Sequence, residues 1–123
     1  MQKQFIIIGS ILAALGVILG AFGAHALKDI LINYNRTDTF DTAVKYHFYH
    51  AFGLLIIGIL SNQFPDKNFN IAGYLIIAGV IIFSGSLYVL CLTNIKWLGA
   101  ITPIGGLLMI MGWSFVVWKM VQK

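Results

Sequence analysis

The sequence contains three histidines, the side chains whose chemistry is most versatile near neutral pH. His25 follows a long apolar segment, whereas His47 and His50 come after a polar segment that contains Asp41. An imidazole can bind a transition metal, relay a proton or hold a hydrogen bond. Positions three apart share a helical face, so His47 and His50 are expected to lie close together. Together with Tyr46 and Asp41, the histidines form a candidate polar site.

Two kinds of interpretation fit the residue types of this candidate polar site. A functional site would be a metal centre, a proton relay or a seat for a lipid headgroup. In a structural role, each histidine would lie at the membrane interface, with an apolar body and a wet polar tip that is hydrogen-bonded to a neighbouring loop. The chain has no HExxH or CxxC pattern, so the spacing gives little support to a metal. We favour the structural role and expect no metal, no cofactor and no catalytic residue.

Other reactive groups are rare in the sequence. It has no GxSxG motif, no phosphate-binding loop and no dinucleotide fingerprint. The one cysteine, Cys91, lies in an apolar segment and is expected to be a small buried residue. We therefore predict that the protein is not an enzyme.

The histidines are carried by apolar segments of unusual length. Four stretches lack Asp, Glu, Lys and Arg, namely residues 4–27, 46–65, 68–95 and 97–118. An α-helix rises about 1.5 Å per residue, so about 20 apolar residues cross a hydrocarbon core about 30 Å thick. The composition agrees, because only 10% of the residues are charged, against roughly 25% in soluble domains. The sequence predicts one all-α transmembrane domain, residues 1–123, with spans at about 5–26, 43–63, 69–92 and 98–118.

Short connections set the expected arrangement of these spans. The second and third spans, and also the third and fourth, are joined by only a few polar residues, so each pair must be antiparallel. The fold class is therefore an integral membrane four-helix bundle with up-down-up-down topology. The net charge of +4 comes from basic residues scattered singly between the spans, which indicates contact with lipid headgroups and no binding of nucleic acid.

Small residues indicate where the helices pack closely. In the first span they share one helical face: Gly9, Ala13, Gly16, Gly20 and Ala24. Such a strip lets two backbones approach in lipid, and its partner would be another helix of this chain or a second copy. A second set lies in the third span and at the start of the fourth: Ser84, Ser86, Pro103, Gly105 and Gly106. Helix packing is the favoured interpretation of this set, and a broken helix of the kind found in transporters is the alternative.

Polar residues precede the second span. A helix that begins near Thr39 would place Asp38 and Asp41 at its positive end, in an arrangement similar to a capping box. The two later histidines would then lie near the membrane surface, on the same side as the first. Whether residues 26–32 continue the first helix or lie on the interface is left open by the sequence.

Four spans place both termini on one side of the membrane. Four basic residues lie on that side and four on the other: Lys3, Lys67, Lys119 and Lys123 against Lys28, Arg36, Lys45 and Lys96. The positive-inside rule is therefore evenly balanced. We expect cytoplasmic termini, because Lys119 and Lys123 lie close together and acidic residues dilute the charge of the opposite loop.

The chain resembles a known bacterial family. The segments GAFGAHALK (20–28), AVKYHFYHA (43–51), FSGSLY (83–88) and TPIGG (102–106), followed by Gly112 and Trp113, are similar to small four-span inner membrane proteins of the YgdD/YwdK type. The resemblance covers nearly the whole chain and implies a multi-pass protein of the bacterial cytoplasmic membrane. It implies no substrate or cofactor, because the family is one of unknown function. His25 and His50 match family histidines, whereas glutamine is common at the position of His47, which argues against a three-histidine metal centre.

We therefore expect a non-enzymatic membrane component that acts by packing with lipid or with another protein, with a second copy of the chain among its candidate partners. The alternative is a small transporter or channel subunit whose polar site is formed by His25 and His50.

Overall fold

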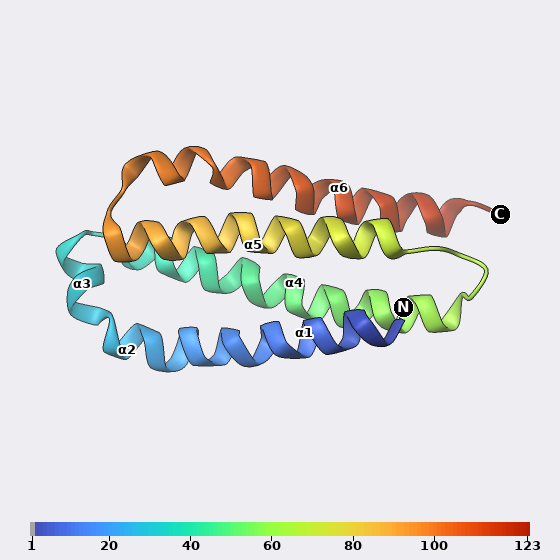
Figure 1. Ribbon diagram of the computed structural model, residues 1–123, viewed down its shortest axis with the longest axis horizontal. Helices are drawn as coiled ribbons and strands as arrows, with labels where there is room; N and C mark the ends of the chain where they lie inside the picture. The colour runs from blue at the N-terminus through green and yellow to red at the C-terminus, as the bar shows by residue number, and fades with distance from the viewer. Residues whose placement is uncertain (1) are drawn as a thin grey trace.

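Helices make up nearly all of the computed structural model, which describes residues 2–123 (Figure 1). Within these residues, four helical segments are long and apolar enough to cross a membrane: Lys3–Ala26, Thr37–Gln63, Asn70–Thr93 and Lys96–Val121. No strand occurs in the same part of the chain. The prediction of an all-α membrane protein with four spans is therefore confirmed.

The first span consists of three consecutive helical pieces. α1 (Gln2–Val17) runs into the π-helix η1 (Ile18–Gly23), and α2 (Ala24–Ala26) completes the span. A π-helix bonds each N–H to the carbonyl five residues back, so it shifts the side chains that follow relative to a straight α-helix. Gly16 before η1 faces Phe48, and Gly23 at its end faces Phe40. The span therefore keeps a glycine toward the second span on both sides of the π-helix.

The chain reverses direction through a short separate helix, α3 (Lys28–Asn33). Its buried residue, Leu31, packs with Phe40 and Cys91. Asn35 then adopts a left-handed conformation with φ of 56°, which asparagine tolerates because its short side chain can hydrogen-bond locally. The segment after the first span is thus a separate short helix and not a continuation of that span.

α4 (Thr37–Gln63) begins six residues before the predicted second span. Its N-cap residue, Arg36, makes no side-chain capping bond, so the expected capping arrangement of Asp38 and Asp41 is wrong. The reason is the tight turn at Asn35, which lets the helix start two residues earlier than Thr39 would allow. Asp38 consequently falls inside the first turn, where its charge still favours the positive end of the helix.

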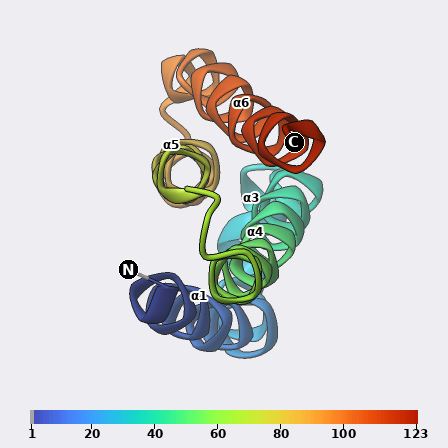
Figure 2. The ribbon, with the colours of Figure 1, turned by 90° about the vertical axis from the view of Figure 1, so that its right-hand side faces the viewer.

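The spanning helices pack as a bent row. α1 packs on α4, α4 on α5 (Asn70–Thr93), and α5 on α6 (Thr102–Val121), with the 3-10 helix η2 (Lys96–Ala100) joining the last two. In the end-on view, α1 and α6 lie at opposite ends of the row (Figure 2). Successive spans run antiparallel, as expected. Because the row does not close, grooves remain between helices that are second neighbours.

The small residues of the first span face α4 of the same chain. A Cβ added to Gly9 would lie 2.8 Å from the backbone oxygen of Ala51, and one added to Gly16 would lie 2.9 Å from the ring of Phe48. A Cβ at Gly20 would lie 3.1 Å from Val44. Larger side chains at these positions would push the two helices apart, so the strip explains the close packing of α1 on α4.

α5 and α6 also approach through glycines. A Cβ at Gly79 would lie 2.5 Å from Cγ of Met109 and 2.9 Å from the backbone oxygen of Gly105. Gly105 in turn lies against the backbone of Phe83, and Gly106 lies beside the ring of that residue. The glycines at the start of α6 therefore let its backbone touch that of α5.

Hydroxyl groups add hydrogen bonds to this packing. The Ser84 hydroxyl donates to the backbone oxygen of Ala43 (2.8 Å), which joins α5 to α4. Ser86 and Thr102 share a hydrogen bond of 2.6 Å at the start of α6. Pro103 lies in the first turn of α6, where a missing backbone N–H costs little. α5 itself is one unbroken helix, so the broken-helix alternative does not apply to it.

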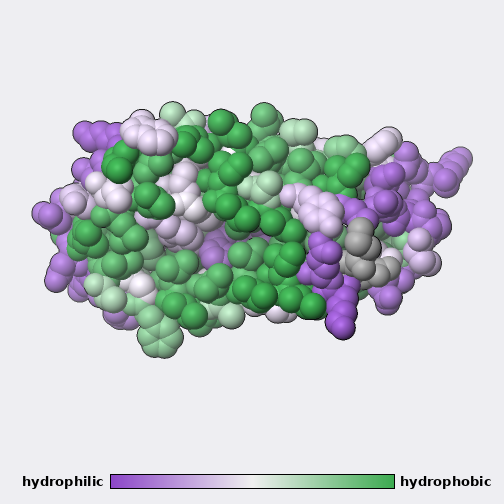
Figure 3. All heavy atoms as spheres, viewed as in Figure 1, coloured by the Kyte–Doolittle hydropathy of each residue, from purple (hydrophilic) through white to green (hydrophobic). Residues whose placement is uncertain are grey.

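The surface has the pattern of a protein that crosses a bilayer. Apolar side chains form a broad belt between two polar ends (Figure 3). Large apolar residues in the belt are exposed, as at Phe22 (69%) and Ile110 (64%). The core is narrower and lies where α1, α4, α5 and α6 meet, around Phe5, Leu54 and Ile76.

Candidate functional site

The structure separates the residues of the candidate polar site. His47 and His50 are buried in α4, with 4% and 6% of their surface exposed. His25, in α2, and Asp41 and Tyr46, in α4, are exposed. In the part of the chain that the structure describes, the side chains of His25 and Asp41 make no hydrogen bond. The five residues therefore do not form one cluster. Tyr46 stays with His50, since their rings stack with centroids 6.3 Å apart and both line one groove, whereas His25 is not brought to His50.

The two buried histidines lie inside the helix bundle, well beyond the first turn of α4. His50 is the central residue of the 27-residue helix α4. His47 lies about 15 Å along the axis from the start of α4, because an α-helix rises about 1.5 Å per residue.

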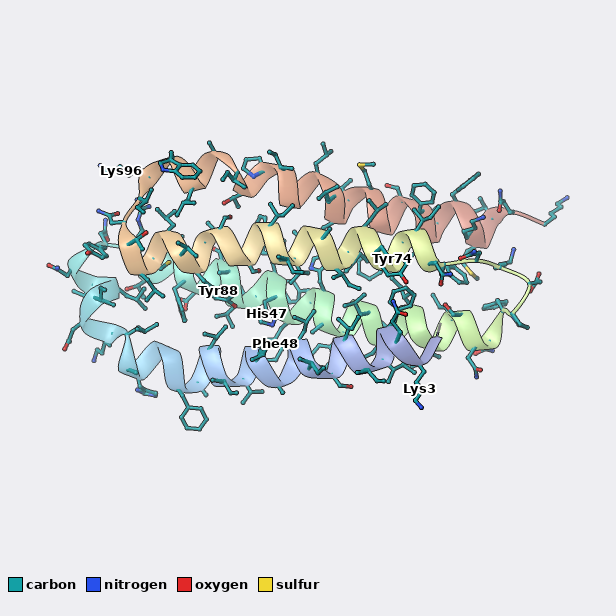
Figure 4. All side chains as sticks on the ribbon, in the orientation of Figure 1. Lys3, His47, Phe48, Tyr74, Tyr88 and Lys96 are labelled. Atoms are coloured by element: carbon teal, nitrogen blue, oxygen red, sulfur yellow. The ribbon has the colours of Figure 1, made fainter. Side chains whose placement is uncertain are left out.

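His47 connects three helices through its two ring nitrogens. Its Nε2 lies 2.6 Å from the backbone oxygen of Leu12 in α1, and a carbonyl oxygen can only accept, so Nε2–H is the donor. In the neutral ring, Nδ1 then accepts from the hydroxyl of Tyr88 in α5 at 2.8 Å. In Figure 4, His47 lies between the ribbons of α1 and α5, with Tyr88 further along toward α3.

His50 connects α4 to α6 with the opposite ring tautomer. Its Nδ1–H donates to the backbone oxygen of Tyr46, one turn earlier, at 2.7 Å. Its Nε2 accepts from the indole Nε1–H of Trp113 at 3.0 Å. An indole nitrogen can only donate, so both roles of the His50 ring are determined and the ring is neutral. The indole also lies directly on Gly53, where an added Cβ would be 2.7 Å from the ring.

A groove opens to the lipid-facing surface beside each histidine. One groove, of about 340 Å³, lies between α1 and α5 and has His47, Ser84 and Tyr88 among its lining residues. The other, of about 450 Å³, lies between α4 and α6 and includes His50 and Trp113. Both are walled mainly by apolar side chains. The side chains of His47, His50, Ser84, Tyr88 and Trp113 are already hydrogen-bonded to one another or to the backbone.

The buried polar side chains are hydrogen-bonded throughout the described interior. Among the residues that the structure describes, no buried side-chain nitrogen or oxygen lacks a hydrogen-bond partner. Near the α3 end, the guanidinium of Arg36 donates to Oδ1 of Asn94 at 3.3 Å, and the Cys91 thiol donates to the Arg36 backbone oxygen at 3.7 Å. The same residues contain no group of three His, Cys, Asp or Glu side chains that could hold a metal ion. The chemistry of the interior is that of hydrogen bonds between helices.

Tyr88 and Trp113 were not among the candidate site residues, although they complete the hydrogen bonds of the histidines. They are separated from their histidine partners by 41 and 63 positions in the sequence. The signal available in the sequence is their position away from the ends of the spans, because amphipathic aromatic residues usually lie at the membrane interface. A tyrosine or tryptophan at greater depth needs a polar partner inside the protein.

Comparison with known proteins identifies similar sequences. A family model described as a protein of unknown function (DUF423) matches residues 19–106. A UPF0382 membrane protein of Staphylococcus haemolyticus is 49% identical over 116 residues, which cover 94% of this chain and 93% of the relative. One from Staphylococcus aureus (strain bovine RF122 / ET3-1) is 50% identical with the same coverage. The UPF0382 membrane protein YwdK of Bacillus subtilis is 45% identical over 117 residues, with 94% of each chain covered. No solved structure matches the chain.

Proposed function

The chain belongs to the DUF423 family of membrane proteins, as its resemblance to the YgdD/YwdK type predicted, and on this premise we propose that it is a non-enzymatic component of the bacterial cytoplasmic membrane. It acts through its outer surface, by packing with lipid or with another membrane protein, and a second copy of the chain is one such partner. Its termini face the cytoplasm.

The use of the buried imidazoles carries this proposal. A group that binds a solute or exchanges a proton with water needs a polar atom that can contact that solute or water. In His47 and His50, both ring nitrogens are instead hydrogen-bonded to neighbouring helices or to the backbone of α4. What remains available to partners is the apolar belt and the headgroup-facing ends, which are the surfaces through which a membrane component packs with its surroundings.

The alternative function is that of a small transporter or channel subunit. One observation favours it, because Tyr88, His47 and the Leu12 carbonyl form a polar chain across α5, α4 and α1. The two functions differ in what crosses the membrane. A transporter must have a state in which this chain is open to water, whereas a packing component needs no such state.

Proton flux into vesicles distinguishes these functions. The purified protein is reconstituted into lipid vesicles that contain a pH-sensitive dye, and a pH gradient is applied with and without a potassium diffusion potential. We expect the flux to equal that of protein-free vesicles. A flux above that level that disappears in a folded His47→Ala variant, or in a folded His25→Ala/His50→Ala variant, would refute the proposal in favour of the transport function.

A further inference from the structure

A groove between α1 and α4 lies at the end of the molecule that carries the C-terminus, away from the histidines. It has a volume of about 560 Å³ and is lined by side chains of both helices: Lys3, Ile6, Ile7, Gly58, Ile59 and Asn62. The groove opens on the outer surface, because Lys3, Ile6, Ile7, Ile59 and Asn62 are all exposed. In a bilayer this surface faces lipid.

The lining changes from polar to apolar along the groove. α1 and α4 are antiparallel, so Lys3 near the start of α1 lies at the same end of the groove as Asn62 near the end of α4. About one turn deeper, Ile6 and Ile7 lie at the level of Ile59. The polar residues therefore lie at the headgroup level, and the apolar residues extend the groove into the hydrocarbon region.

The polar end of the groove has side-chain groups that can bind a ligand. In the part of the chain that the structure describes, Lys3 and Asn62 make no hydrogen bond or ion pair. In Figure 4, the Lys3 side chain points outward from α1, away from the rest of the row. An ammonium group offers three N–H donors and one positive charge, and an amide adds two further donors. These groups together suit an anionic phosphate.

The inner part of the groove is apolar. Gly58 is buried there and lines the groove together with Ile7 and Ile59. Flexible apolar walls of this kind suit a hydrocarbon chain that lies along the seam. A polar end for a phosphate and an apolar channel below it match the two parts of a phospholipid.

We propose that the α1–α4 groove is a binding site for one anionic phospholipid, with Lys3 and Asn62 at the headgroup phosphate and an acyl chain along Ile6, Ile7 and Ile59. This inference rests on the proposed function and names the class of lipid with which the protein packs. A zwitterionic lipid has the same acyl chains but no net charge, so the site prefers the anionic one. The preference is an electrostatic effect of one lysine, and it is about fivefold.

Native mass spectrometry tests this preference. The protein in mild detergent is mixed with phosphatidylglycerol and phosphatidylcholine of identical acyl chains, and the retained lipids are counted. We expect one phosphatidylglycerol per chain in about fivefold preference. Lys3→Gln should remove the preference, and Asn62→Asp should reduce it by repelling the phosphate. Lys3→Arg should retain it, because the charge is kept.

The matched control is Lys123→Gln, which removes an exposed charge at the same end of the molecule without touching the groove. It should leave the preference unchanged. Equal retention of the two lipids by the unmodified protein, or an equal loss in Lys123→Gln and Lys3→Gln, would overturn the proposal. These outcomes are independent of the proton-flux assay, so this site and the proposed function can fail separately.

Photo-crosslinking locates the acyl chain. Phosphatidylglycerol with a photoactivatable group in its acyl chain is irradiated with the protein in vesicles, and the labelled peptides are mapped. We expect labels concentrated on Ile6, Ile7 and Ile59. Equal labelling of Ile110, an exposed residue of α6 outside the groove, would indicate general contact with the bilayer and contradict a site.

Discussion

The hydrogen bond between His50 and Trp113 joins two helices that are not neighbours in the row. If the indole N–H is removed, Nε2 of His50 stays buried without a donor, which costs about 1–3 kcal/mol. Interhelical hydrogen bonds measured in membrane proteins contribute less on average, about 0.6 kcal/mol, because the unfolded chain in lipid also finds partners. The free energy contributed by the His50–Trp113 hydrogen bond should lie toward the upper end of these values, because both ring nitrogens of His50 are hydrogen-bonded.

We expect Trp113→Phe to lower the free energy of unfolding by about 1–3 kcal/mol. The measurement is unfolding by SDS titrated into detergent micelles. His50→Leu and the double variant complete a thermodynamic cycle, and the coupling energy should exceed about 0.5 kcal/mol. Strictly additive effects would show that the two side chains do not interact.

Ser84 makes a smaller contribution of the same kind. Its hydroxyl donates to the Ala43 backbone oxygen, which also belongs to the helical hydrogen bonding of α4, so loss of the hydroxyl leaves no acceptor without a donor. We expect Ser84→Ala to destabilise the protein by about 0.5–1.5 kcal/mol. Ser114→Ala is the matched control, because Ser114 is exposed and bonds within its own helix. If Ser114→Ala destabilised the protein as much as Ser84→Ala, the hydrogen bond between α5 and α4 would contribute no more than one within a single helix.

At the level of whole helices, α5 and α6 are held close together by contacts at glycine. At Gly79 an added methyl group would meet the backbone oxygen of Gly105 and the backbone nitrogen of Met109, both at 2.9 Å. Backbone atoms of a packed helix cannot move aside singly, so α6 as a whole would have to shift. Gly85, in the same helix, has no atom within 4 Å of the position of a Cβ.

We therefore expect opposite results for two chemically identical substitutions. Gly79→Ala should destabilise the protein by about 1–3 kcal/mol through overpacking. Gly85→Ala should be neutral or stabilise it by up to about 1 kcal/mol, because alanine is the better helix former. Both are measured by SDS-induced unfolding. A Gly79→Ala variant as stable as Gly85→Ala would mean that α5 and α6 do not touch as described.

The elements themselves were predictable to different degrees. The lengths of the charge-free stretches set the number and approximate position of the spans, because a bilayer imposes a minimum helix length. The π-helix at Ile18–Gly23 and the separate helix α3 were not predictable, since they depend on how α1 and α4 fit together. The same applies to the start of α4, which a left-handed residue at Asn35 determines.

At the scale of the molecule, the order of the helices and the hydrogen bonds between them depend on tertiary packing. Local sequence pattern identified the histidines as the informative residues, but it could not select Tyr88 and Trp113 as their partners, which lie on other spans. It also grouped His25 with His50, although the structure leaves His25 exposed at the end of the first span. Residues that the order of the spans places on the same side of the membrane need not be in contact in three dimensions.

The orientation in the membrane is a further prediction at this scale. We expect a C-terminal fusion to green fluorescent protein to be fluorescent in bacterial cells and a C-terminal fusion to alkaline phosphatase to be inactive. The basis is that Lys119 and Lys123 lie close together, whereas Asp29, Asp38 and Asp41 dilute the positive charge of the opposite loop. Active alkaline phosphatase with a dark fluorescent protein would place the termini outside.

We propose that the buried histidines of this molecule hold its helices together and are not a reactive site. Nitrogen-15 NMR of histidine-labelled protein in lipid bilayers tests it directly, with the exposed His25 as a reference for the contact with water. We predict two neutral rings of opposite tautomer at pH 7, with the proton on Nε2 in His47 and on Nδ1 in His50, and both signals insensitive to exchange with water. Two rings of the same tautomer, or rings that exchange protons with water as fast as His25, would contradict the account.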